Sequence, residues 1–193
     1  MMDDDNIKAI ICARGGYGTV RTLQHLDFHY FSRHPKWIIG FSDITVLHNY
    51  INQQLHIKTL HAQMPLNFPK TGTDNRATEL LRNVLFGKLL SYSWEPVHQV
   101  NLPGDLSGIL TGGNLSVISS LAGSPLDLQT KGRILFLEDV DEYLYHIDRM
   151  MMNLKLSKKL DNLAGLMIGG MTSMNDNPVP FGKNAYQIIY DIT

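Results

Sequence analysis

Short apolar segments alternate with helical patterns in the first part of the chain, and this alternation restricts the fold more than any other feature. Residues 7–13 form an apolar run that predicts a strand, a glycine turn follows at 15–18, and residues 19–26 carry a helical pattern. A second apolar run, 37–41, leads into a helical pattern at 45–54. Because this order favours a parallel sheet flanked by helices, we predict an α/β fold with function at the carboxyl ends of its strands.

The alternation resumes after a region rich in proline, glycine and polar residues. The pattern predicts a helix at 75–86 and then, in order, a strand at 108–110, a helix at 115–121, a strand at 133–137, a helix at 143–156 and a strand at 164–168. We therefore predict two domains joined by a linker. The amino-terminal domain, 1–69, has a parallel sheet with helices on both faces; the linker is 70–103; the smaller carboxyl-terminal domain, 104–193, is mixed α/β.

Composition excludes several classes of protein. A net charge of −1 argues against a nucleic-acid partner, and no run of about 18 apolar residues suggests a membrane span. The acidic start of the chain is unlike a basic signal peptide. Cys12, the only cysteine, lies in an apolar run, where we expect a buried structural thiol. We therefore expect a soluble cytoplasmic protein without disulfides within the chain.

Ser42 occupies a position where a buried strand should turn sharply into a helix. Gly40 permits a tight backbone, and Asp43 is expected to cap the helix that begins at Thr45. Such a turn lifts a serine hydroxyl to the edge of the sheet beside free N–H groups, as an acyl-transfer nucleophile requires. The alternative is an ordinary helix start, since the sequence lacks the final glycine of G-x-S-x-G.

Three glycines follow Arg14 in the first glycine turn, which spans residues 15–18. Exposed backbone in such a turn can point N–H groups at an anion, which suggests an oxyanion donor. The turn does not match a dinucleotide fingerprint, because Arg21 stands where the third glycine should be. A purely structural turn is the alternative.

An acidic cluster follows the strand predicted at 133–137. It consists of Glu138, Asp139, Asp141 and Glu142, and His146 lies four residues beyond Glu142 on the next helix. A metal site is one interpretation, but there is no H-E-x-x-H motif, so we predict no metal. Glu138 directly ends the apolar strand, so we expect its carboxylate to be held rigidly at the sheet edge, where it could orient a catalytic histidine.

The chain has eight histidines, and none follows His146. We expect His48 and His61 to be packed or capping residues, and we predict that neither replaces a catalytic base beside Ser42.

Several motifs, in this order, resemble the serine LD-carboxypeptidases of peptidase family S66, which include muramoyltetrapeptide carboxypeptidases and microcin C self-immunity peptidases. The matching blocks are Ala13-Arg14-Gly15-Gly16-Tyr17-Gly18, Gly40-Phe41-Ser42-Asp43-Ile44-Thr45, Thr59-Leu60-His61-Ala62-Gln63-Met64, Gly112-Gly113-Asn114-Leu115, and Leu135-Phe136-Leu137-Glu138-Asp139 with Tyr145-His146-Ile147-Asp148-Arg149. One departure is Ala62-Gln63, where the family usually has glycine and proline.

The resemblance implies a catalytic site without metal or cofactor. It makes Ser42 the nucleophile and Glu138 the acidic triad residue, with an oxyanion hole formed by backbone N–H groups of Asp43 and of Gly15 or Gly16. It also leads us to expect the triad histidine after residue 193 and the family's first strand and helix before residue 1, as in a fragment lacking both ends. The chemistry of a free substrate carboxylate suggests Arg14, Asn114 and Arg149 as binding residues.

The implied reaction removes the terminal D-alanine from a murein tetrapeptide during peptidoglycan recycling. Two alternatives stay open: a microcin-type immunity peptidase, for which Tyr92 and Trp94 are the candidate nucleobase-stacking residues, and an inactive remnant or binding module. The implied partner is the murein peptide, and the resemblance is also compatible with a homodimer in the full-length protein.

Overall fold

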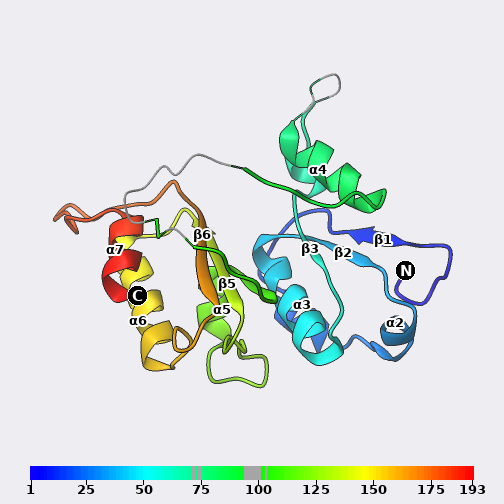
Figure 1. Ribbon diagram of the computed structural model, residues 1–193, viewed down its shortest axis with the longest axis horizontal. Coiled ribbons are helices and arrows are strands. Elements are labelled where there is room, and N and C mark those ends of the chain that lie inside the picture. Colours follow the sequence, from blue (N-terminus) through cyan, green and yellow to red (C-terminus); the bar gives the residue numbers. More distant parts are fainter. Residues whose placement is uncertain (71–72, 74, 94–100, 103) are drawn as a thin grey trace. The chain divides into compact units, whose positions relative to one another are not determined.

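The computed structural model describes residues 1–193 except 71–72, 74, 94–100 and 103, and it divides into two compact units (Figure 1). The first unit is Met1–Pro103 and the second is Gly104–Thr193. Each unit contains a sheet in which three strands pair in parallel, so the predicted α/β fold class is confirmed. Trp94, one of the two aromatic candidates for nucleobase stacking, lies outside the described residues.

The sheet of the first unit has the strand order β1-β2-β3. Its strands are β1 (Ala9–Ile11), β2 (Trp37–Gly40) and β3 (Leu60–His61). The other elements are α1 (Thr19–Leu23), α2 (His29–Arg33), the 3₁₀ turn η1 (Ser42–Ile44), α3 (Thr45–Tyr50), the π-helical turn η2 (Ile51–Leu55), the 3₁₀ turn η3 (Pro65–Asn67) and α4 (Arg76–Leu85). Because all three strands run in the same direction, the segments that follow them meet at one edge of the sheet.

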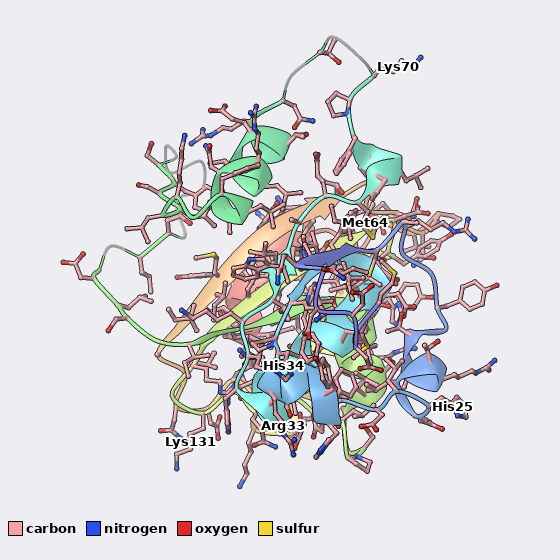
Figure 2. The ribbon with its side chains drawn as sticks, turned by 90° about the vertical axis from the view of Figure 1, so that its right-hand side faces the viewer. His25, Arg33, His34, Met64, Lys70 and Lys131 are labelled. Atoms are coloured by element: carbon pink, nitrogen blue, oxygen red, sulfur yellow. The ribbon has the colours of Figure 1, made fainter. Side chains whose placement is uncertain are left out.

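Apolar side chains of the central strand and of the surrounding helices form the core of the first unit. Ile39 of β2 and Phe31 of α2 are fully buried, and Ile51 is 1% exposed. Met64, after β3, is also buried, whereas His25 and Lys70 lie at the surface (Figure 2). These contacts hold β2, and with it the turn at its carboxyl end, in a fixed position.

The sheet of the second unit has the order β4-β5-β6. Its elements are β4 (Leu110–Asn114), α5 (Leu115–Leu121), β5 (Ile134–Val140), α6 (Leu144–Leu156), β6 (Gly165–Thr172) and α7 (Ala185–Ile192). Along β5 the buried residues alternate: Leu135 and Leu137 belong to the hydrophobic core, Asp139 is buried on the same face, and Phe136 and Glu138 occupy the other face. The strand therefore holds two successive carboxylates on opposite faces.

Most elements differ from their predicted bounds by one to four residues, and two of the differences have a visible cause. The helix predicted at 45–54 changes from α-helical to π-helical hydrogen bonding at Ile51 and ends at His56, whose φ is +57°. Strand β6 continues beyond residue 168 because, after a register shift, Met171 pairs with Asp139 of β5. Among the described residues, no helix has the length and apolarity needed to cross a bilayer.

Candidate active site

The turn that carries Ser42 follows directly from strand β2. Phe41 is extended, and Ser42 has a φ of +59°, in the left-handed region that residues with a Cβ seldom adopt. The turn is tight, because a Cβ at Gly40 would lie 2.8 Å from Cγ1 of Ile44. Unfavourable backbone conformations of this kind cluster at functional sites, so the conformation of Ser42 favours a catalytic role over an ordinary helix start.

The backbone of Gly15 lies against the Ser42 side chain. A Cβ built on Gly15 would lie 3.0 Å from Oγ of Ser42, which means that only glycine fits here without displacing the hydroxyl. A Cβ on Gly16 would lie 3.8 Å from a carboxylate oxygen of Asp43. The structure thus brings together three of the segments that the sequence singled out: the first glycine turn, Ser42 and Asp43.

Asp43 does not cap its own helix, and that prediction was wrong. The N-cap residue of α3 is Ile44, without a side-chain hydrogen bond. The Asp43 carboxylate, 7% exposed, instead accepts two hydrogen bonds from Thr19, one from its backbone N–H at 2.9 Å and one from its Oγ1 at 2.6 Å. The reason is that Asp43 lies within the 3₁₀ turn that precedes α3, and its carboxylate is directed to the start of α1.

His48 is buried on helix α3 and supports the strand end rather than the serine. Its Nε2 lies 2.9 Å from the carbonyl oxygen of Gly40, and burial lowers its pKa to about 4. The imidazole is therefore neutral near pH 7, Nε2 carries the proton and donates it to Gly40, and Nδ1 has no hydrogen-bond partner. Its Nε2 is thus occupied by the carbonyl of Gly40; that His48 does not replace a base for Ser42 stays a prediction. His61 lies nearby, with its ring centroid 6.1 Å from that of His48.

The buried imidazole predicts acid sensitivity in the first unit. The unfolded chain binds a proton at His48 near pH 6.5, whereas the folded protein binds it only near pH 4. Lowering the pH from 7 to 4 therefore favours unfolding, and this residue should remove about 3 kcal/mol from the free energy of unfolding. In urea unfolding at a series of pH values, His48→Gln, which keeps a donor for Gly40, should show a correspondingly flatter pH dependence than the unsubstituted protein.

The control for this prediction is His25→Gln, which changes an exposed imidazole of the same unit. It should leave the pH dependence as it is. A His48→Gln protein with the same pH dependence as the unsubstituted protein would show that His48 is not kept neutral by burial.

Glu138 lies near the carboxyl end of β5 in the second unit. Burial, and to a smaller extent the charge of Asp139, raise its pKa to about 7, while a hydrogen bond from Asn114 opposes this shift. A Cβ on Gly169 of the neighbouring strand would lie 2.9 Å from the ring of Phe136 and 3.2 Å from Cβ of Glu138, so the glycine makes room for both side chains. A carboxylate in this environment gains stability from a positively charged partner.

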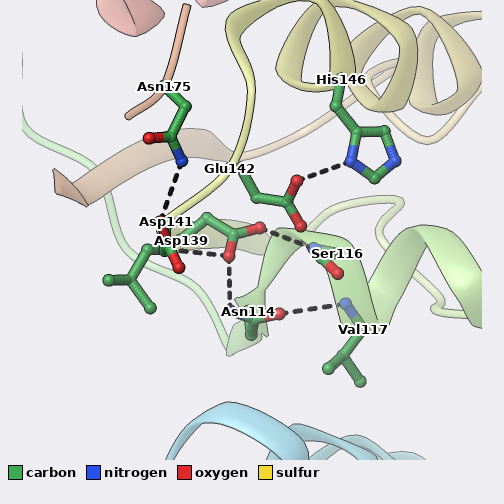
Figure 3. Close-up of polar contacts among 9 residues, drawn as sticks. Asn114, Ser116, Val117, Asp139, Asp141, Glu142, His146 and Asn175 are labelled. Carbon is green, nitrogen blue, oxygen red and sulfur yellow. Dashed lines mark hydrogen bonds and ion pairs between the residues drawn. The ribbon is translucent and has the colours of Figure 1, made fainter. Parts of the chain in front are cut away.

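Asn114 connects the acidic residues to helix α5 (Figure 3). Its Nδ2 donates to Asp139 Oδ1 at 2.9 Å, and its Oδ1 accepts a hydrogen bond from the N–H of Val117, which caps the helix. Asp139 Oδ2 also accepts from the N–H of Ser116 at 2.9 Å. The Asn114 side chain is buried and already engaged within the protein, and these contacts support a role in fixing Glu138 and Asp139.

The rest of the acidic cluster is engaged in local contacts (Figure 3). Glu142 Oε2 lies 2.6 Å from Nδ1 of His146, and Asp141 accepts a hydrogen bond from Asn175. Over the described parts of the chain, no three histidine, cysteine or acidic side chains are grouped as metal ligands.

The remaining candidates are arginines. Arg14, at the start of the first glycine turn, is exposed and accessible to a ligand. Arg149 lies on α6 with its guanidinium 5.4 Å from the ring centroid of Tyr145, a cation–π contact. Because Ser42 and Glu138 belong to different units, their pairing stays a prediction.

Comparison with known proteins relates both units of the chain to one protein family. Residues 1–62 match the model of the LD-carboxypeptidase N-terminal domain, and residues 107–193 match that of the LD-carboxypeptidase C-terminal domain. A probable murein peptide carboxypeptidase of Bacillus subtilis is 39% identical over 173 residues, which cover 87% of this chain and 53% of the relative. The murein tetrapeptide carboxypeptidase of Pseudomonas aeruginosa is 31% identical over 179 residues, 88% of this chain and 58% of that protein. The chain thus spans about half the length of these curated relatives.

Solved structures share the fold. The crystal structure of muramoyltetrapeptide carboxypeptidase from Oxalobacter formigenes aligns with a TM-score of 0.85 at 27% identity, covering 97% of this chain and 64% of that one. The microcin C7 self immunity protein MccF, solved in complex with aspartyl sulfamoyl adenosine, aligns with a TM-score of 0.80 at 21% identity, covering 99% of this chain and 65% of that one. The second likeness shows the fold alone.

Proposed function

Because this chain belongs to the LD-carboxypeptidase family, we propose that it carries the nucleophile and the acidic triad residue of a serine-type LD-carboxypeptidase. The proposed substrate is a murein tetrapeptide, which loses its terminal D-alanine during peptidoglycan recycling in the cytoplasm. The observation that best supports this proposal is the left-handed φ of Ser42, with the backbone of Gly15 against its hydroxyl.

In the proposed reaction, Oγ of Ser42 attacks the carbonyl carbon that joins an L-centre to D-alanine. The hydroxyl proton passes to a general base and from there to the departing amine of D-alanine, which leaves an acyl-enzyme ester. Water then hydrolyses the ester and regenerates the serine. The carbonyl oxygen, negatively charged in the tetrahedral intermediate, accepts hydrogen bonds from the N–H groups of Asp43 and of Gly15 or Gly16.

We assign Glu138 the role of orienting the base and stabilising its protonated form. Its raised pKa supports this role, since a poorly solvated carboxylate is stabilised by a cation beside it. Arg14 is the proposed donor to the free carboxylate of the substrate. The Asn114 side chain is already hydrogen-bonded to Asp139, so we propose that Asn114 supports the acidic residues and that Arg14 contacts the substrate.

The test uses the polypeptide encoded by the whole reading frame, here called the full polypeptide. Incubated with an L,D-tetrapeptide, it should release free D-alanine, measured with D-amino acid oxidase. It should not release L-alanine from the L,L diastereomer, measured by chromatography of the free amino acid, and chelators should leave the rate unchanged because no metal takes part in the proposed reaction.

Other outcomes would replace this proposal. Hydrolysis of an acyl-sulfamoyl adenosine with no attack on the tetrapeptide would indicate a microcin-type immunity peptidase. Binding of the tetrapeptide without any turnover would indicate an inactive remnant or a binding module.

A further inference from the structure

The buried side chain of Asp43 links two segments that are distant in the sequence. Its Oδ2 accepts hydrogen bonds from both the N–H and the Oγ1 of Thr19, 24 residues earlier. Thr19 is the first residue of α1 and directly follows the first glycine turn, and Asp43 directly follows Ser42. The link therefore joins the residue after the glycine turn to the residue after the serine.

The chemistry of the link makes it stiff. Hydrogen bonds to an ionised carboxylate are shorter and roughly twice as strong as those between neutral groups. The two donors of Thr19 converge on one oxygen, and the carboxylate is only 7% exposed, so water competes little for it. The N–H of Thr19 also lacks a partner within its own helix, because the first N–H groups of a helix have none there.

The distance between the two linked segments matters for the proposed reaction. In that proposal, the N–H of Asp43 and an N–H of the glycine turn must both face one oxygen of the tetrahedral intermediate. Gly15 lies close enough to Ser42 that a Cβ built on it would be 3.0 Å from the Ser42 hydroxyl oxygen. A displacement of about 1 Å between the two segments would misalign one donor and can cost on the order of 100-fold in rate.

We propose that Asp43 is a positioning residue: its carboxylate, through Thr19, sets the distance between the glycine turn and Ser42. This inference rests on the proposed function for its kinetic consequence but on the Asp43–Thr19 contact for its geometry. It assigns a role to the side chain of Asp43 that is separate from that of its backbone N–H.

The test compares variants of the full polypeptide as LD-carboxypeptidases. Asp43→Asn keeps the size of the side chain but removes the charge, and it should lower kcat about 10- to 100-fold with little change in KM, because the oxyanion forms after substrate binds. Thr19→Val removes one of the two donors and should lower kcat in the same direction. Thr19→Ser, which keeps the hydroxyl, should restore most of the kcat that Thr19→Val loses.

The matched control is Asp27→Asn. Asp27 is an exposed aspartate whose Oδ1 accepts a hydrogen bond from the N–H of His29 near the start of α2, at 2.8 Å. Removing its charge should leave kcat unchanged. The double variant of Asp43→Asn and Thr19→Val should be no slower than Asp43→Asn alone, since both changes break one link.

The outcomes separate this inference from the proposed function. An active protein in which Asp43→Asn and Thr19→Val keep full kcat would overturn the positioning role. If the unsubstituted protein releases no D-alanine, amide hydrogen exchange decides instead: faster exchange at residues 15–19 in both variants supports the link, and unchanged exchange overturns it. Should Asp43→Asn fail to fold, the Thr19→Val and Thr19→Ser pair gives the same decision.

Discussion

Replacing Ser42 with alanine should lower turnover of an L,D-tetrapeptide by about four to six orders of magnitude in the full polypeptide. Only the nucleophile is removed, so oxyanion-hole and binding contributions stay in place. Binding of the peptide should persist, and the loss should therefore appear in kcat, measured by release of D-alanine. Ser32→Ala is the control, because Ser32 is exposed and its hydroxyl bonds only locally, to the carbonyl of His29.

A glycine at the same position separates catalysis from stability. Ser42 has a φ of +59°, which is unfavourable for residues with a Cβ but not for glycine. Ser42→Gly should be as inactive as Ser42→Ala, yet more stable than it by roughly 1 kcal/mol. Full activity in both variants, together with inhibition by a chelator, would refute the serine mechanism. The acidic residues around Glu138 would then be candidate metal ligands.

Local patterns in the sequence were sufficient to predict most elements. The helix predicted at 115–121 has these bounds in the structure, because Asn114 provides an N-cap and the apolar spacing is regular. The turn at Ser42 was also predicted, since the apolar strand contains Gly40 near its end and is followed by the polar residues Ser42 and Asp43. These features depend on neighbours within one turn or strand, which the sequence displays directly.

Contacts between distant segments could not be predicted in the same way. The Asp43 carboxylate had two possible uses, a cap for its own helix or a partner elsewhere, and only the fold places Thr19 beside it. The neutral state of His48 likewise depends on burial by several elements. The left-handed φ of Ser42 and the closeness of Gly40 to Ile44 are features of the folded turn that periodicity does not reveal.

Replacing Gly112 with alanine should prevent stable folding of the second unit. Gly112 has a φ of +124°, and a Cβ there would lie 1.9 Å from the carbonyl oxygen of Phe136 on the paired strand. Backbone atoms on both sides fix this distance, so the clash can be relieved only by separating β4 from β5. We expect a loss of more than about 4 kcal/mol, a large share of a typical domain's stability. Amide hydrogen exchange of β5 residues during urea titration measures this loss for the second unit specifically.

Gly123→Ala is the matched control for this prediction. Gly123 also has a positive φ, +76°, but no atom lies within 4 Å of the Cβ position, so only the backbone conformation opposes the substitution. It should cost about 1 kcal/mol. Equal losses for the two variants would mean that positive φ alone accounts for both and that β4 is not held against Phe136. A much larger loss at Gly112 would show that β4 can pair closely with β5 only because residue 112 has no Cβ. The same pairing places Asn114 beside Glu138.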